Sequence, residues 1–128
     1  MLKKTITYTD YNGTEWTEDF YFNISKAELM DMEMGINGGM STMINKIIAT
    51  HDNAALYKLF TDLITKAYGE KSLDGKRFVK SKELSDSFVQ TEAYSALLDE
   101  FLSNSESAAA FVNGILPKLD NKTLPSAN

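Results

Sequence analysis

The sequence contains no cysteine and a single histidine, His51. The absence of cysteine excludes disulfide bonds, thiol catalysis and thiolate metal sites, and one histidine cannot form a multi-histidine metal site or a histidine relay. No apolar stretch approaches the roughly 20 residues that a helix needs to cross a bilayer. The start of the chain does not resemble a secretory signal, so we expect a soluble, intracellular protein.

Basic residues are also scarce relative to acidic ones. The chain has 13 lysines and arginines against 18 aspartates and glutamates, which gives a formal net charge of −5. Because nucleic-acid phosphates repel an acidic domain, this charge disfavours a nucleic-acid binder. Hydrophobic residues make up 43% of the 128 residues, which is enough to build the core of about one ordinary domain.

The first 24 residues alternate in polarity with a period of two, which predicts a β-hairpin around Asn12-Gly13. For Ile6 and Tyr8 to share a face with Trp16 and Phe20, even-numbered positions must pair with even-numbered positions. A two-residue loop would pair odd with even. We therefore predict a three-residue loop over residues 11–13, with Gly13 left-handed and Tyr8 opposite Trp16.

From residue 25 onward the period becomes helical. Ser25 and Glu28 form a capping box, Ser81 and Thr91 are predicted N-caps, and Gly69 is the predicted C-terminal cap of the longest apolar stripe. A second, minor hairpin is suggested near Phe78. The prediction is an α+β fold, mostly α, in which an N-terminal β-hairpin (1–24) precedes a bundle of about five short helices (25–116) with a basic loop at 69–80. Residues 1–116 are expected to form a single domain, and 117–128 a disordered tail.

No constellation of side chains suited to catalysis is recognisable. His51 falls at the end of a predicted helix, where it complements the helix dipole, and no serine or threonine lies in a nucleophile motif. The adjacent carboxylates at 18–19 and 99–100 diverge on a strand or a helix and cannot converge on one substrate. We therefore predict no enzyme activity, no cofactor and no metal site.

The methionines are the strongest indication of a binding surface. Apart from Met1, all of them lie between residues 30 and 43. Methionine suits surfaces that adapt to a partner's shape, although it also fills cores. Met30, Met32 and Met34 cannot all face one way on a helix, so some should be exposed or covered by another chain. The predicted partner-binding residues are these three methionines with Trp16, Phe20 and Phe22; core packing is the alternative.

Charge is segregated along the chain. Acids dominate from Asp10 to Glu33, bases dominate from Lys66 to Lys82, and only acids occur from Glu83 to Glu106. Such a run is often a solvated face, but opposite patches on one small domain can also meet head to tail between copies. The residues predicted for self-association are Lys71, Lys76, Arg77 and Lys80.

Four stretches resemble the tail assembly chaperones of long-tailed phages and prophages of Gram-positive bacteria. They read KKTITYTDYNG at 3–13, FYFNISKAEL at 20–29, AYGEKS at 67–72 followed by DGKRF at 74–78, and QTEAY at 90–94. The resemblance extends to about residue 116, and the family has no active site to carry over.

The resemblance implies a non-catalytic protein of the host cytoplasm that is absent from the mature virion. Such a chaperone binds the tape measure protein and keeps it soluble before the tail tube polymerises. Its implied partners are the tape measure protein, further copies of itself and, less directly, the tail tube protein, with no nucleic acid and no membrane.

Two other readings stay open. A structural virion subunit, such as a tail or head–tail connector protein, would use the hairpin as an assembly arm. A small acidic phage protein that inhibits a host factor would bind a basic host protein tightly. The chaperone is the leading interpretation, the virion subunit is second and the inhibitor of a host factor is third.

Overall fold

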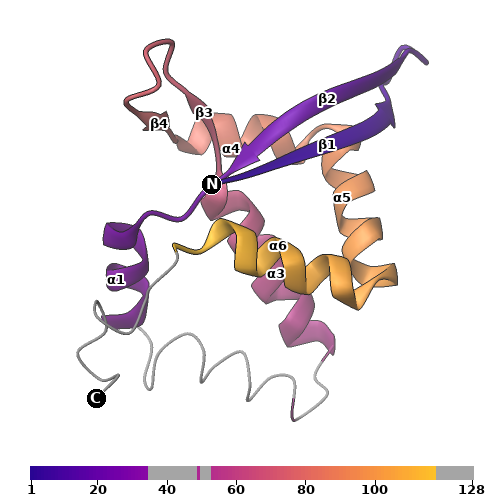
Figure 1. Cartoon of the computed structure of the whole chain (residues 1–128). Helices are drawn as coiled ribbons and strands as arrows, with labels where there is room; N and C mark the ends of the chain where they lie inside the picture. The colour runs from indigo at the N-terminus through magenta and orange to yellow at the C-terminus, as the bar shows by residue number, and fades with distance from the viewer. Residues whose placement is uncertain (35–48, 50–52, 118–128) are drawn as a thin grey trace.

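The computed structural model describes residues 1–34, residue 49 and residues 53–117 (Figure 1). The strands are β1 (Leu2–Thr9), β2 (Glu15–Phe22), β3 (Tyr68–Lys71) and β4 (Phe78–Val79). In the described ranges the helices are α1 (Lys26–Met34), α3 (Asn53–Ala67), α4 (Lys82–Val89), α5 (Glu92–Ser103) and α6 (Ser105–Ile115). The predicted class, α+β with an N-terminal hairpin ahead of mostly helical structure, is confirmed.

The first hairpin has the predicted register. Tyr8 pairs with Trp16 and Ile6 with Glu18, so even-numbered residues face even-numbered residues along the whole ladder. The Asp10 amide donates to the Thr14 carbonyl at 2.8 Å, which leaves residues 11–13 as the loop. Gly13 has a φ of 84°, the left-handed conformation that glycine adopts without steric cost. The predicted three-residue loop is therefore confirmed.

A second hairpin extends this sheet to four strands in the order β1-β2-β3-β4. The strand β3 pairs antiparallel with β2 at Tyr21–Gly69 and Phe22–Tyr68, and β4 pairs with β3. The minor hairpin suggested near Phe78 is present, but the sequence analysis did not anticipate that it would join the first one.

The predicted role of Gly69 as a helix cap is wrong. The helix α3 ends at Ala67, and Gly69 lies in β3 without a left-handed φ. A Cβ atom built at Gly69 would lie 2.6 Å from the Val79 carbonyl oxygen and 2.7 Å from the Phe78 ring. Glycine is required here because the neighbouring strand β4 lies too close for any side chain.

The predicted helix starts are present. The Glu28 amide donates to Ser25 Oγ at 3.1 Å while the Ser25 amide donates to Glu28 Oε1 at 2.9 Å, which is a complete capping box. Ser81 and Thr91 cap α4 and α5, and Asn104 caps α6. The predicted helix containing Met40 and Met43 lies outside the described residues, as does the predicted tail at 117–128 except for Pro117.

The core lies between the inner face of the sheet and the helices. Phe22 is fully buried, with ring centroids 5.7 Å from Phe88 and 5.3 Å from Phe111. Tyr68 stacks on Phe88 at 4.4 Å with an interplanar angle of 10°. These aromatic contacts join β2, β3, α4 and α6, so the root of the hairpin is part of the core.

We predict that Gly69→Ala lowers the free energy of unfolding by about 1–3 kcal/mol, because the added methyl group overlaps the backbone of β4. Urea unfolding followed by circular dichroism measures the change. Gly13→Asn is the control, since nothing lies within 4 Å of a Cβ there and asparagine tolerates a positive φ. Equal stability of the two variants would show that β4 is not packed against Gly69.

Candidate binding surfaces

The helix α1 presents two of the three predicted methionines to solvent. Met30 is 64% exposed and Met34 is 85% exposed, whereas Met32 packs partly against the core and Leu29 is buried. In Figure 1, α1 lies at one side of the molecule, well separated from α5. The helix thus anchors itself through Leu29 and leaves a methionine surface, Met30 and Met34, exposed.

The three predicted aromatic contact residues occupy different environments. Trp16 is 45% exposed near the tip of the hairpin, and Phe20 is half-buried, with its ring 5.3 Å from that of Phe88. Phe22 has no exposed surface. Phe22 is therefore a core residue, and its assignment to a contact surface is corrected, because β3 and α6 cover the root of the hairpin and leave the tip open.

Hydrogen bonds fix the tip of the hairpin. Trp16 Nε1 donates to Asp10 Oδ2 at 2.7 Å, and the Thr14 amide donates to Asp10 Oδ1 at 2.9 Å. The Trp16 hydrogen bond, aided by these backbone amides, lowers the pKa of Asp10. The Tyr8 hydroxyl donates to Glu18, which raises the pKa of Tyr8 to about 12. Glu18 accepts this hydrogen bond on the same face of the hairpin as Tyr8 and Trp16.

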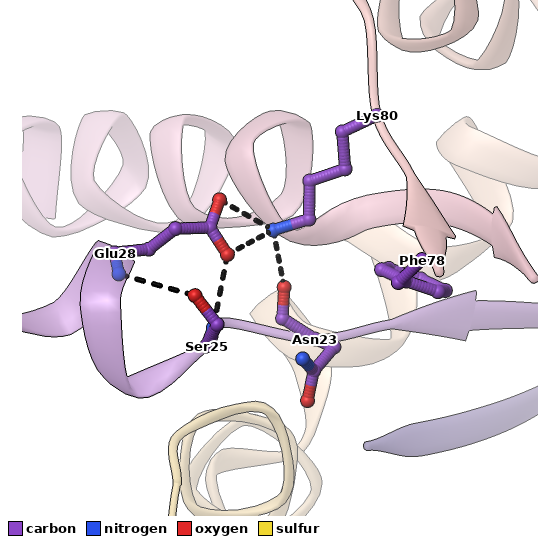
Figure 2. A pocket seen from close by; sticks show the side chains of 5 residues that line it. All are labelled: Asn23, Ser25, Glu28, Phe78 and Lys80. Carbon is purple, nitrogen blue, oxygen red and sulfur yellow. Dashed lines mark hydrogen bonds and ion pairs between the residues drawn. The ribbon is translucent and has the colours of Figure 1, made fainter. Parts of the chain in front are cut away.

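An ion pair fastens α1 to the end of β4. Lys80 Nζ lies 2.8 Å from both carboxylate oxygens of Glu28 and donates to the Asn23 carbonyl at 2.5 Å. Figure 2 shows these groups converging at a pocket of about 390 Å³, which Ser25 and Phe78 also line. Burial acts to raise the pKa of Glu28, but the hydrogen bonds from Lys80 and the Ser25 amide outweigh it and the pKa falls.

The residues predicted for self-association do not form one free basic patch. Lys80 is engaged with Glu28, and Lys71 Nζ lies 4.5 Å from the centre of the Tyr21 ring. Lys76 and Arg77 are exposed at the β3–β4 turn, and neither side chain has an ion-pair partner within the described residues. The free basic charge of the loop is therefore concentrated at Lys76 and Arg77.

The structure also contains an apolar groove that the sequence analysis missed. It has a volume of about 870 Å³ between α3, α5 and α6, and Leu56, Phe60, Leu102, Val112 and Leu116 contribute to its walls. Periodicity within each helix could not reveal it, because the groove forms where three stripes meet. Asn53, the first residue of α3, also lines this groove.

Among the described residues no group of three or more histidines, cysteines or acids is placed to hold a metal ion. His51 lies outside the described ranges. Within the same ranges, no helix is both long and apolar enough to cross a membrane. The described surfaces offer exposed apolar side chains, hydrogen-bonded carboxylates and, on the β3–β4 turn, the exposed bases Lys76 and Arg77.

The chain matches a family model described as phage tail assembly chaperone over residues 1–124. No curated protein and no solved structure matches it. Because the match covers nearly the whole chain, the protein belongs to the phage tail assembly chaperone family. This membership supports a chaperone role with protein partners in tail assembly, and it confirms the resemblance found in the sequence.

We predict that Glu28→Gln makes stability less sensitive to acid. The lowered pKa of Glu28 means that its carboxylate stabilises the fold above its ordinary value of 4.5, and that this contribution is lost as the pH falls through the folded-state pKa. Urea unfolding between pH 7 and pH 3 should show the variant less stable at neutral pH, with the difference shrinking on acidification.

Glu83→Gln, an exposed glutamate in the first turn of α4, is the matched control and should follow the wild type at every pH. If the gap between Glu28→Gln and the wild type stays constant across this range, the Glu28 carboxylate does not gain its stability from Lys80.

Proposed function

We propose that this protein binds the tape measure protein and keeps it soluble until the tail tube polymerises around it, without catalysing a reaction. Further copies bind along the same target, and arriving tail tube protein displaces them. In this proposal the protein acts in the host cytoplasm and is absent from the mature virion. The observation that carries the proposal, together with family membership, is the exposed methionine surface, Met30 and Met34, on α1.

The physical requirement for such a protein is an apolar contact surface on a domain that does not aggregate. The two methionines supply flexible, polarizable contact area that can fit successive stretches of a long target. The net charge of −5 opposes non-specific aggregation of the free protein through these exposed apolar side chains. Trp16 at the hairpin tip adds a second exposed apolar group.

Co-expression with the tape measure protein from the same genome tests the proposal directly. With an affinity tag on one chain, we expect a soluble complex that contains several copies of this protein per target. If the target precipitates while this protein elutes alone, the chaperone assignment fails. Recovery of this protein in purified phage particles would favour the structural virion subunit instead.

We predict that the double variant Met30→Ser, Met34→Ser weakens binding to the tape measure protein by about tenfold or more, because it removes two exposed apolar side chains from the contact. Titration of the purified proteins by calorimetry or fluorescence anisotropy measures the affinity. Thermal unfolding should change little, since neither side chain is buried.

Leu73→Ser is the matched control, because Leu73 is a fully exposed apolar residue on the β3–β4 turn, away from α1. We expect it to bind as tightly as the wild type. Unchanged affinity in a folded Met30, Met34 variant would remove α1 from the contact surface.

A further inference from the structure

Besides the outer edge of β1, which is the first strand in the sheet order, two strand edges lack a neighbouring strand within the described residues. The strand β3 covers β2 at Tyr21 and Phe22 alone, so from Glu15 to Asp19 the outer edge of β2 has no neighbouring strand there. The strand β4 is the last in the sheet order and has an open outer edge as well. Figure 1 shows the first hairpin and the β3–β4 hairpin diverging from their common root. An open edge is a template for pairing with another chain.

The hydrogen-bond pattern determines which residues each edge offers. Asp10 and Thr14 are a hydrogen-bonded pair of the first hairpin, so the backbone groups of the odd residues Glu15, Thr17 and Asp19 point away from β1. The bond from the Asn23 amide to the Ala67 carbonyl confirms that odd residues face the β3 side. In the second hairpin the Ser72 amide donates to the Arg77 carbonyl, so the even residues Phe78 and Lys80 point outward from β4.

We propose that two copies of this chain associate head to tail, with the distal edge of β2 (Glu15–Asp19) of one copy pairing antiparallel with the β4 edge (residues 76–80) of the next. To form hydrogen bonds between the copies, an odd-numbered residue of β2 must lie opposite an even-numbered residue of the β4 edge. The two residue numbers of every facing pair therefore add to an odd number. The register in which they sum to 95 sets Thr17 opposite Phe78 of the second copy. It also sets Glu18 opposite Arg77 and Asp19 opposite Lys76 of the second copy.

Charge favours this register over its neighbours. Shifting it by two residues in either direction removes both opposite-charge pairs, because Arg77 or Glu18 then faces an apolar residue. Lys76 and Arg77 are the two bases of the basic loop that are exposed and lack an internal ion-pair or ring partner among the described residues. The carboxylates of Glu18 and Asp19 are held in place by Tyr8 and Thr5, so they are already ordered before association.

The same register also covers exposed apolar surface. Trp16, which is 45% exposed, comes to lie opposite Val79 of the second copy, which is 37% exposed. Burying these two side chains against each other adds an apolar contact two positions along the strands from the Glu18–Arg77 pair. Each copy carries one acidic edge and one basic edge, so the contact is heterologous and repeats into rings or helical arrays.

This inference deepens the self-association that forms part of the proposed function. The test uses the protein without the tape measure protein. A failure to self-associate would therefore leave binding to the tape measure protein untouched, and a failure to bind the tape measure protein would leave self-association untouched. A repeating contact between copies would let the protein cover a target longer than itself.

The experiment is light scattering coupled to size-exclusion chromatography, over a range of protein concentrations at low salt. We expect the wild type to form species larger than a dimer as its concentration rises, and to dissociate as salt screens the charge pairs. Two charge-reversal variants are compared with it: Glu18→Arg with Asp19→Arg, and Lys76→Glu with Arg77→Glu. Each should weaken self-association by at least about tenfold, because like charges then face each other.

Mixing the two variants is the decisive measurement. The first variant keeps its basic β4 edge, and the second variant keeps its acidic β2 edge, so these two unchanged edges can still pair. The arginines introduced on β2 of the first variant can also pair with the glutamates introduced at the β4 edge of the second. The mixture should therefore re-form assemblies that neither variant forms alone, and recovery also shows that both variants are folded. Slowed amide exchange at Thr17 and Asp19 on assembly would mark the paired edge of β2.

Lys26→Glu with Lys66→Glu is the control for Lys76→Glu with Arg77→Glu. It makes the same change in net charge, but at exposed bases away from both edges. It should assemble as the wild type does. A wild type that stays monomeric at all concentrations would overturn the proposal. A closed dimer that survives both charge reversals, or a mixture that does not re-associate, would overturn it as well.

Discussion

The structure depends on how the last residues of β2 are held. Three consecutive residues hold this end of the strand. Phe22 pairs with Tyr68 of β3. The Asn23 amide donates to the Ala67 carbonyl at the end of α3, and the Ile24 amide donates to the Ile115 carbonyl at the end of α6, both at 2.8 Å. Phe22 lies at the same point, with its ring against those of Tyr68, Phe88 and Phe111. Segments from the start, middle and end of the domain therefore meet at one buried strand end, and each of them loses packing if it moves.

This constraint divides the first hairpin into two halves with different properties. The root is buried on its inner face and flanked by β3, whereas residues 15–19 of β2 are exposed on both faces. The distal half keeps its shape through cross-strand contacts of its own, among them the Thr7–Thr17 hydroxyl pair at 3.0 Å and the Trp16–Asp10 hydrogen bond. A short protruding ribbon with ordered side chains and an open backbone edge is suited to binding another chain, because little conformational entropy remains to be lost.

The sequence predicted local structure well and long-range pairing poorly. The hairpin register followed from side-chain parity, and the starts of α1, α4 and α5 followed from Ser25, Ser81 and Thr91, because these signals act over a few residues. Gly69 was misassigned because a glycine after an apolar helix usually marks a C-terminal cap, and nothing in the local sequence shows that β4 packs closely against it. Phe20 and Phe22 fall on the same face of the predicted strand, so the sequence pattern does not distinguish them. The burial of Phe22 by β3 and α6 could therefore not be foreseen.

The same difference between local and long-range information explains the charges. Along the sequence, residues 66–82 form one basic run, but the fold directs Lys80 to Glu28, Lys71 to the Tyr21 ring and Lys82 to Asp86. These contacts involve residues separated by 52, 50 and 4 positions, so the two long-range ones become visible only in three dimensions. Lys76 and Arg77 lie in a turn that is closed by hydrogen bonds from their own amides to Asp74 Oδ1 and Ser72 Oγ. In an acidic protein, two adjacent bases exposed at a rigid turn are a localised site for acidic surfaces, and the hairpin of another copy offers such a surface.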